Sequence, residues 1–234
     1  MQTLETKTIA NYVVENIKTA SIFQKYHINY SLNGDKNLIE VCKNKDVNPI
    51  RLLKELKTID SKLSFFKNYN GWSLEFLIDY ILKIQHQYAE DRIPVAINLS
   101  NSVSEKHGNT FPKLYAIQKI FLDFSLELTK QMKYEEYVVF PAIADIITKQ
   151  NYHQDFKTQI ENSRKDHFEL FRKIEKIRAL TNHYKQPEID CKTVHAFFYT
   201  LKSFDLDFQK HLHLENNILF PKVLKLILGV KTIA

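Results

Sequence analysis

Two segments of the chain, 131–141 and 211–221, repeat one pattern of residues. Each places a Glu four residues after its first position and ends in Phe-Pro. The first position is His211 in one segment and Gln131 in the other. Residues four apart lie on one face of a helix, and a His and a Glu so spaced can present nitrogen and oxygen ligands to a metal inside a helical bundle. The pattern therefore predicts two matching helices that face a common core.

A lone His precedes each segment at nearly the same distance. His86 stands 45 residues before Gln131, and His167 stands 44 residues before His211. The chain thus contains two similar pairs of helices. In each pair, one helix carries a lone His, and the other carries a Glu one helical turn after a Gln or a His. The repeat also predicts a defect, because Gln131 stands where the symmetry calls for a His.

Composition favours long helices over a strand-rich fold. The 234 residues include only 4 Gly and 6 Pro, too few for many tight turns. Apolar residues recur at helical spacing, which predicts an all-α chain. We expect a small helical domain over 1–62, a linker from Ser61 to Gly71, and a four-helix bundle over 72–230. The bundle helices are expected at about 73–102, 112–149, 154–183 and 188–228.

The apolar stripes of these helices carry the ligand-type residues. Ile78, Leu82 and His86 lie four apart, and Val138 follows Glu135 on the stripe of the second helix. Pro141 falls inside that second helix and is expected to bend or break it.

A buried metal explains the ligand-type residues better together than singly. A lone His on an apolar stripe is usually a hydrogen-bonded core residue. Here His86, Glu135, His167, His211 and Glu215 lie on four separate stripes, and two carboxylates in one core repel each other. Bound metal removes that cost, because carboxylates and imidazoles ligate it. The pattern therefore predicts a metal site in the bundle.

Other titratable residues are weaker candidates. Glu127 and Asp207 each stand one turn before a ligand position, and Asp166 precedes His167. We interpret them either as acids that support the ligands or as ordinary helix-surface charges. His213, two residues after His211, is expected at the surface or beside the ligands.

Charge and cysteine content exclude several classes. The net charge of +6 comes from Lys and Arg interspersed with Asp and Glu, which indicates a mixed surface rather than a nucleic-acid partner. Cys42 and Cys191 show no paired spacing, and Cys42 is expected to be buried. No apolar run approaches 18 residues and no signal core opens the chain, so we expect a cytoplasmic protein with no membrane segment.

At these motifs the chain resembles the repair-of-iron-centres family of hemerythrin-like di-iron proteins. The resemblance covers nearly the whole chain and rests on the Glu-Lys-His-Gly-Asn run at 105–109, the run from Glu135 to Pro141, and Leu-Glu-Asn-Asn-Ile-Leu-Phe-Pro at 214–221. It implies a four-helix up-down hemerythrin-like bundle preceded by a small helical domain. It also implies iron ligands at His86, Glu135, His167, His211 and Glu215.

Two elements of the family pattern are altered. The remaining family His falls on Gln131, a weak or lost ligand, so the two iron ions that the resemblance implies could be reduced to one. The leading domain of the family normally carries a Cys-Cys-Gly-Gly motif, and here these positions read Ser31-Leu32-Asn33-Gly34. Chemistry that depends on those thiols has no matching residues in this chain.

The resemblance implies a non-haem iron protein that repairs iron-sulfur clusters damaged by nitrosative or oxidative stress. Its partners would be damaged iron-sulfur proteins, or nitric oxide and dioxygen at the iron, and a homodimer is a possible assembly. The alternative is a non-catalytic module that senses iron, nitric oxide or dioxygen with a degraded metal site. These two readings differ in whether the chain turns over a substrate. A metal-free structural remnant is a third reading, which Gln131 alone favours.

Overall fold

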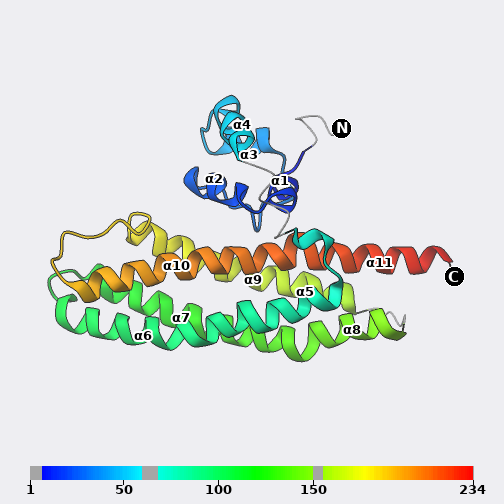
Figure 1. Ribbon diagram of the computed structural model, residues 1–234. Helices are drawn as coiled ribbons and strands as arrows, with labels where there is room; N and C mark the ends of the chain where they lie inside the picture. Colours follow the sequence, from blue (N-terminus) through cyan, green and yellow to red (C-terminus); the bar gives the residue numbers. More distant parts are fainter. Residues whose placement is uncertain (1–6, 60–67, 150–154, 234) are drawn as a thin grey trace. The chain divides into compact units, whose positions relative to one another are not determined.

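The computed structural model describes residues 7–59, 68–149 and 155–233, with side chains described as far as residue 229. The described part of the chain is helical, and an isolated bridge between Thr8 and Asn37 is its one β-type pairing. The expected all-α fold, a helical bundle preceded by a helical N-terminal region, is confirmed (Figure 1). No helix in this part of the chain is both long and apolar enough to cross a membrane.

Four short helices open the chain: α1 (Ile9–Glu15), α2 (Thr19–Lys25), α3 (Leu38–Asn44) and α4 (Pro49–Thr58). Three of them begin at side-chain caps, formed by Thr8, Asn37 and Asn48. Each cap accepts hydrogen bonds from backbone N–H groups that the first helical turn leaves unpaired. Pro49 follows Asn48 at the first helical position, as expected from the sequence.

A small apolar core holds these helices together. It includes Phe23, Ile28, Tyr30 and Leu52, each at most 1% exposed. Cys42 belongs to the same core, so the expected burial of this thiol is confirmed. Of the predicted linker, residues 61–67 lie outside the described residues, and Tyr69–Gly71 forms a 3₁₀ turn (η2).

Long helical rods follow. The first joins α5 (Leu74–Tyr80), a π-helical segment η3 (Ile81–His86) and α6 (Gln87–His107). The second joins α7 (Lys113–Tyr134), the π-helical turn η4 (Glu135–Val139) and α8 (Phe140–Lys149). The third is α9 (Phe156–Leu180). The fourth joins α10 (Lys192–Leu214), the π-helical turn η5 (Glu215–Leu219) and α11 (Phe220–Ile233).

By their contacts the residues group into two compact units, 1–78 with 209–234, and 79–208. In the second unit α7 packs against both α6 and α9. Phe204 and Phe208 of α10 pack edge-on against Phe124 of α7, with ring centroids 5.8 and 5.1 Å apart. Such aromatic pairs contribute about 0.5–1.5 kcal/mol beyond their buried area. The domain boundaries at 1–62 and 72–230 stay a prediction.

Candidate metal centre

Three of the rods contain π-helical turns, and each turn contains a predicted ligand. His86 is the last residue of η3, Glu135 is the first residue of η4, and Glu215 is the first residue of η5. A π turn is a one-residue enlargement of an α-helix and often occurs at functional sites. The three turns therefore mark the same region that the ligand pattern marks.

The Phe-Pro pairs explain two of these turns. The backbone N–H of Phe140 donates to the carbonyl of Glu135, and that of Phe220 donates to the carbonyl of Glu215. Pro141 and Pro221 lack an N–H and cannot continue the ordinary α-helical ladder. The wider turn ends just before each proline, so the repeated spacing of Glu and Phe-Pro corresponds to a π turn in both helices. The helix does not break at Pro141, contrary to one outcome expected from the sequence.

The π turns also shift the apolar stripes. Before His86 the buried residues are Leu77 and Ile81, whereas Ile78 and Leu82 are partly exposed. After Glu135 the buried residue is Val139, whereas Val138 is 37% exposed. The assignments of Ile78, Leu82 and Val138 to these stripes, made with a constant helical period, were therefore wrong by one residue, because a π turn is wider than an α turn and shifts the buried face.

Both ring nitrogens of His86 lie near carboxylates. Its Nδ1 lies 2.9 Å from Oε1 of Glu136, and its Nε2 lies 3.4 Å from Oε2 of Glu135. The ring also stacks on Phe140, with centroids 5.8 Å apart. A carboxylate accepts hydrogen bonds, so Nδ1 carries the hydrogen of this contact, and in the neutral tautomer with that hydrogen Nε2 offers a lone pair. His86 thus directs a ligand nitrogen at Glu135.

The carboxylate of Glu136 also forms an ion pair with Lys133. Lys133 Nζ donates to Oε2 of Glu136 at 2.8 Å and to Oε1 of Glu90 at 2.9 Å. Burial alone would raise the pKa of Glu136, but its hydrogen bonds from Lys133 and His86 more than offset this, and the pKa lies below its usual range. Glu136 is therefore an ionised partner for His86. Sequence reasoning missed this role, because a residue directly after Glu135 projects about 100° away on a regular helix.

Glu135 is fully buried and contacts the other predicted positions of its unit. Gln131 Nε2 donates to Oε1 of Glu135 at 2.8 Å. His167 Nε2 lies 2.9 Å from the same oxygen. Three residues that the sequence predicted together, Gln131, Glu135 and His167, thus form one hydrogen-bonded cluster across α7, η4 and α9.

His211 and Glu215 form the matching pair on the fourth rod. His211 Nε2 lies 3.2 Å from Oε2 of Glu215, one helical turn away. The two side chains are 4% and 0% exposed. An imidazole nitrogen beside a carboxylate oxygen in a dry core needs a positive charge, from a proton or a metal ion, because burial of a charged group alone is costly.

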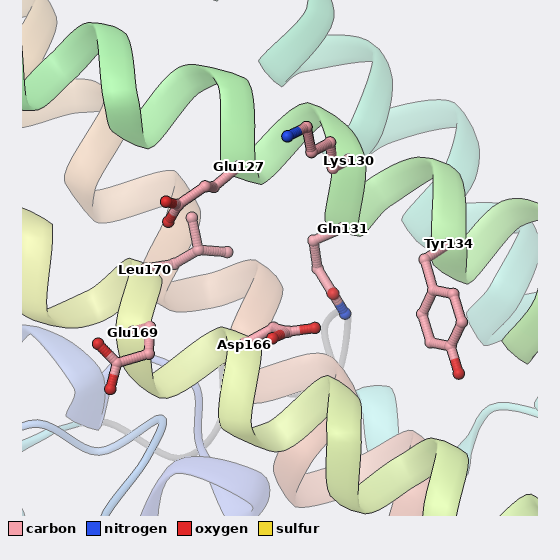
Figure 2. Close-up of a pocket in the computed structure, with 7 residues that line it drawn as sticks. All are labelled: Glu127, Lys130, Gln131, Tyr134, Asp166, Glu169 and Leu170. Carbon is pink, nitrogen blue, oxygen red and sulfur yellow. The ribbon is translucent and has the colours of Figure 1, made fainter.

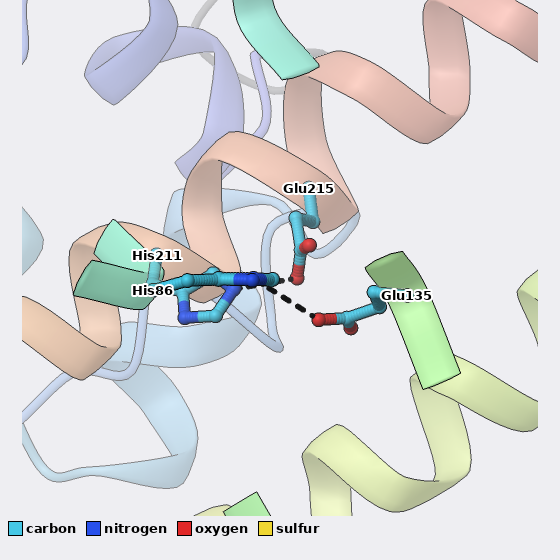
Figure 3. A group of neighbouring side chains, drawn as sticks. All are labelled: His86, Glu135, His211 and Glu215. Atoms are coloured by element: carbon cyan, nitrogen blue, oxygen red, sulfur yellow. Dashed lines mark ion pairs between the residues drawn. The ribbon is translucent and has the colours of Figure 1, made fainter. Parts of the chain in front are cut away.

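Two His and two Glu side chains form a compact group (Figure 3). His86, Glu135, His211 and Glu215 are all buried, and each offers a ligand atom within 4.8 Å of the others. Figure 3 draws the ion pairs of His86 with Glu135 and of His211 with Glu215. Imidazole nitrogen with carboxylate oxygen is a donor set for iron, zinc or manganese. The residues present therefore fit a bound transition metal, which would balance the two buried carboxylates.

Comparison with known proteins agrees with this geometry. Residues 77–223 match the family described as hemerythrin HHE cation binding domain. This chain belongs to the hemerythrin HHE family. Residues 5–60 match a second family, described as a domain of unknown function (DUF542). The hemerythrin match covers every predicted ligand, from His86 to Glu215.

Three relatives of this hemerythrin-family chain carry one functional name. The iron-sulfur cluster repair protein YtfE of Pectobacterium atrosepticum is 24% identical over 208 residues, which cover 89% of this chain and 92% of the relative. The iron-sulfur cluster repair protein ScdA of Staphylococcus haemolyticus is 26% identical over 215 residues, 92% and 96% of the two chains. A YtfE of Yersinia pseudotuberculosis is 25% identical over 211 residues, 89% and 92%.

A pocket of about 330 Å³ opens beside Gln131 (Figure 2). Its walls come from α7 and α9, and they carry Glu127, Lys130, Gln131, Tyr134, Asp166, Glu169 and Leu170. Burial raises the pKa of Asp166. Two of the acids proposed to support the ligands, Glu127 and Asp166, thus face this pocket, although Glu127 also accepts a hydrogen bond from Lys173. Asp207 is not among the lining residues; its charge, with burial as the larger cause, raises the pKa of Tyr88.

Position 31, where the family resemblance implies a thiol, is closely packed. Ser31 is fully buried, and its hydroxyl donates to Oδ1 of Asn29 at 2.9 Å. Asn217, in η5, donates through Nδ2 to the carbonyl of Tyr30 at 3.0 Å. His213 is fully buried beside Tyr30, with burial lowering its pKa to about 3. A surface position for His213 was therefore wrong, since the loop at 29–34 covers that face of the helix.

Proposed function

We propose that this chain is a non-haem iron protein that repairs iron-sulfur clusters damaged by nitrosative or oxidative stress. The observation that carries this proposal is the buried group of His86, Glu135, His211 and Glu215 in a chain of the hemerythrin family. The names of relatives that match nearly its full length support the same function. Damaged iron-sulfur proteins would be its substrates.

In this proposal His86 and His211 provide imidazole nitrogens, and Glu135 and Glu215 provide carboxylate oxygens. The bound iron would supply coordination positions at which nitric oxide, dioxygen or peroxide can bind and exchange electrons. Glu136 would keep the hydrogen of His86 on Nδ1, so that Nε2, on the side of the ring that faces Glu135, is the nitrogen that binds the iron. Phe140, stacked on His86, limits the access of water to that ring.

A repair assay tests this function directly. An iron-sulfur enzyme that has been inactivated with nitric oxide is incubated with the iron-loaded protein, and recovery of its activity is followed. We expect recovery with the native chain and with His195→Ala, which changes an exposed His on the same helix, α10. We expect its loss with His211→Ala and with Glu215→Ala. Equal recovery with all four proteins would contradict an iron role in repair.

Binding without turnover is the second candidate function, and the packing around Ser31 favours it. The thiols of the family motif are replaced by Ser31 and Leu32, and Ser31 is hydrogen-bonded in a closed loop. A sensor of nitric oxide or dioxygen needs the iron but not the thiols. Anaerobic addition of nitric oxide to the ferrous protein should then give an iron-nitrosyl absorption. This absorption without any cluster repair would support the sensor and contradict the repair function.

A further inference from the structure

The two carboxylate oxygens of Glu135 face different neighbours. Oε2 lies 3.4 Å from Nε2 of His86, a member of the four-residue group. Oε1 lies 2.8 Å from Nε2 of Gln131 and 2.9 Å from Nε2 of His167. One oxygen of the carboxylate therefore faces the imidazole of another proposed iron ligand, and the other oxygen accepts hydrogen bonds.

Gln131 acts toward Glu135 as a hydrogen-bond donor. An amide nitrogen that carries two hydrogens has no lone pair to offer a metal. The amide is oriented by Glu135, because a carboxylate accepts hydrogen bonds and attracts the nitrogen rather than the oxygen of the amide. Figure 2 shows the end of Gln131 directed toward Asp166, across the pocket that both residues line.

His167 is engaged in the same way. Its Nε2 and Oε1 of Glu135 are close enough for a proton to lie between them. This nitrogen therefore contacts Glu135 through Oε1, whereas His86 contacts it through Oε2. His167 is not among the four residues whose ligand atoms form the group. With Gln131, it places two hydrogen bonds on Oε1, which matches the two lone pairs of that oxygen.

We propose that this chain binds a single iron ion, at His86, Glu135, His211 and Glu215, and that Gln131 and His167 are positioning residues that hold Glu135. This rests on the proposed iron binding and replaces the two ions that the family resemblance implies. The carboxylate of Glu135 then binds the metal through Oε2, while its other oxygen is fixed by the amide and the imidazole.

The test compares native protein with two variants at position 131. Each is loaded anaerobically with excess Fe(II), desalted, and measured for iron per chain. After oxidation, electron paramagnetic resonance separates an isolated ferric ion, which gives a strong high-spin signal, from a coupled ferric pair, which is silent. Gln131→His supplies the missing imidazole. Gln131→Leu removes the hydrogen bond to Glu135 without adding a ligand.

We expect one iron per chain and the isolated-ion signal in native protein. Gln131→His should approach two irons per chain with loss of that signal, and Gln131→Leu should stay at one iron with weaker retention. Two irons per chain and a silent ferric state in native protein would overturn the single-ion proposal and leave iron binding intact. Native protein that retains no iron would overturn the proposed function itself.

Discussion

The carboxylate of Glu136 and the imidazole of His86 form a hydrogen bond of 2.9 Å between Oε1 and Nδ1. His86 and Glu136 lie on different helical rods, 50 residues apart in sequence. Lys133 holds the second oxygen of Glu136, so both oxygens have partners. The orientation of one proposed iron ligand therefore depends on a residue that does not touch the iron.

Removal of this carboxylate should weaken iron binding. We expect Glu136→Leu to lower iron affinity about 10- to 100-fold, the usual effect of losing a hydrogen-bond partner of a ligating His. Glu136→Gln should cost less, because its amide oxygen still accepts from Nδ1. Competition with a chromogenic chelator measures both. Glu175→Leu, at an exposed position on α9, is the control and should bind iron like the native chain.

Gly34 should tolerate no side chain. A Cβ at this position would come within 2.2 Å of Oδ1 of Asn217, whose amide is held by the carbonyl of Tyr30. We expect Gly34→Ala to lower the free energy of unfolding by about 1–3 kcal/mol, as overpacking does. Gly229→Ala is the matched control, because nothing lies within 4 Å of its Cβ, and it should stabilise α11 by about 0.5–1 kcal/mol. Urea denaturation of both variants measures these changes. A Gly34→Ala variant as stable as the native chain would contradict the prediction and show that Asn217 moves aside.

An ion pair between the largely buried Arg178 and the buried Asp205 joins α9 to α10. Arg178 Nε donates to Oδ2 of Asp205 at 2.6 Å, and Tyr184 donates its hydroxyl to the same oxygen at 2.9 Å. Asp205→Ala leaves the guanidinium without its counter-ion and should cost about 3–5 kcal/mol of unfolding free energy. The double variant Arg178→Met with Asp205→Leu should recover most of that loss. A double variant that is no more stable than Asp205→Ala would contradict this account.

Cys191 should react with thiol reagents near neutral pH. Hydrogen bonds from the backbone N–H of Val194, and then from His107, lower the pKa of Cys191 to about 7. The thiolate is the reactive form, so alkylation should rise with pH, with a midpoint about 7. His107→Ala should move that midpoint upward. Burial raises the pKa of Cys42, so this thiol should react slowly throughout. Peptide mapping after labelling distinguishes the two, and faster labelling of Cys42 would refute the prediction.

The sequence predicted the helices well because apolar spacing and scarce Gly and Pro act locally. It also placed His86, Glu135, His211 and Glu215 on helix faces directed at one core, and these four side chains form a group. That they bind a metal stays a prediction, and so does a ligand role for His167. It could not predict that Gln131 donates to Glu135, because the orientation of an amide depends on its neighbours in space. The buried state of His213 depends on the loop at 29–34, which lies about 180 residues earlier in the chain.

The π turns at Glu135 and Glu215 change the direction in which the buried face of each helix points, so that the face before the turn and the face after it are not in line. Each turn contains one residue more than an α-helix needs, so the rods before and after it keep separate angular settings, offset by about 100°. Loss of one residue within 136–139 would erase the offset and turn the buried face of α8 toward solvent while α7 kept its own. The length of each turn is therefore as tightly constrained as the identity of its Glu, and a single-residue deletion there should be more damaging than most substitutions.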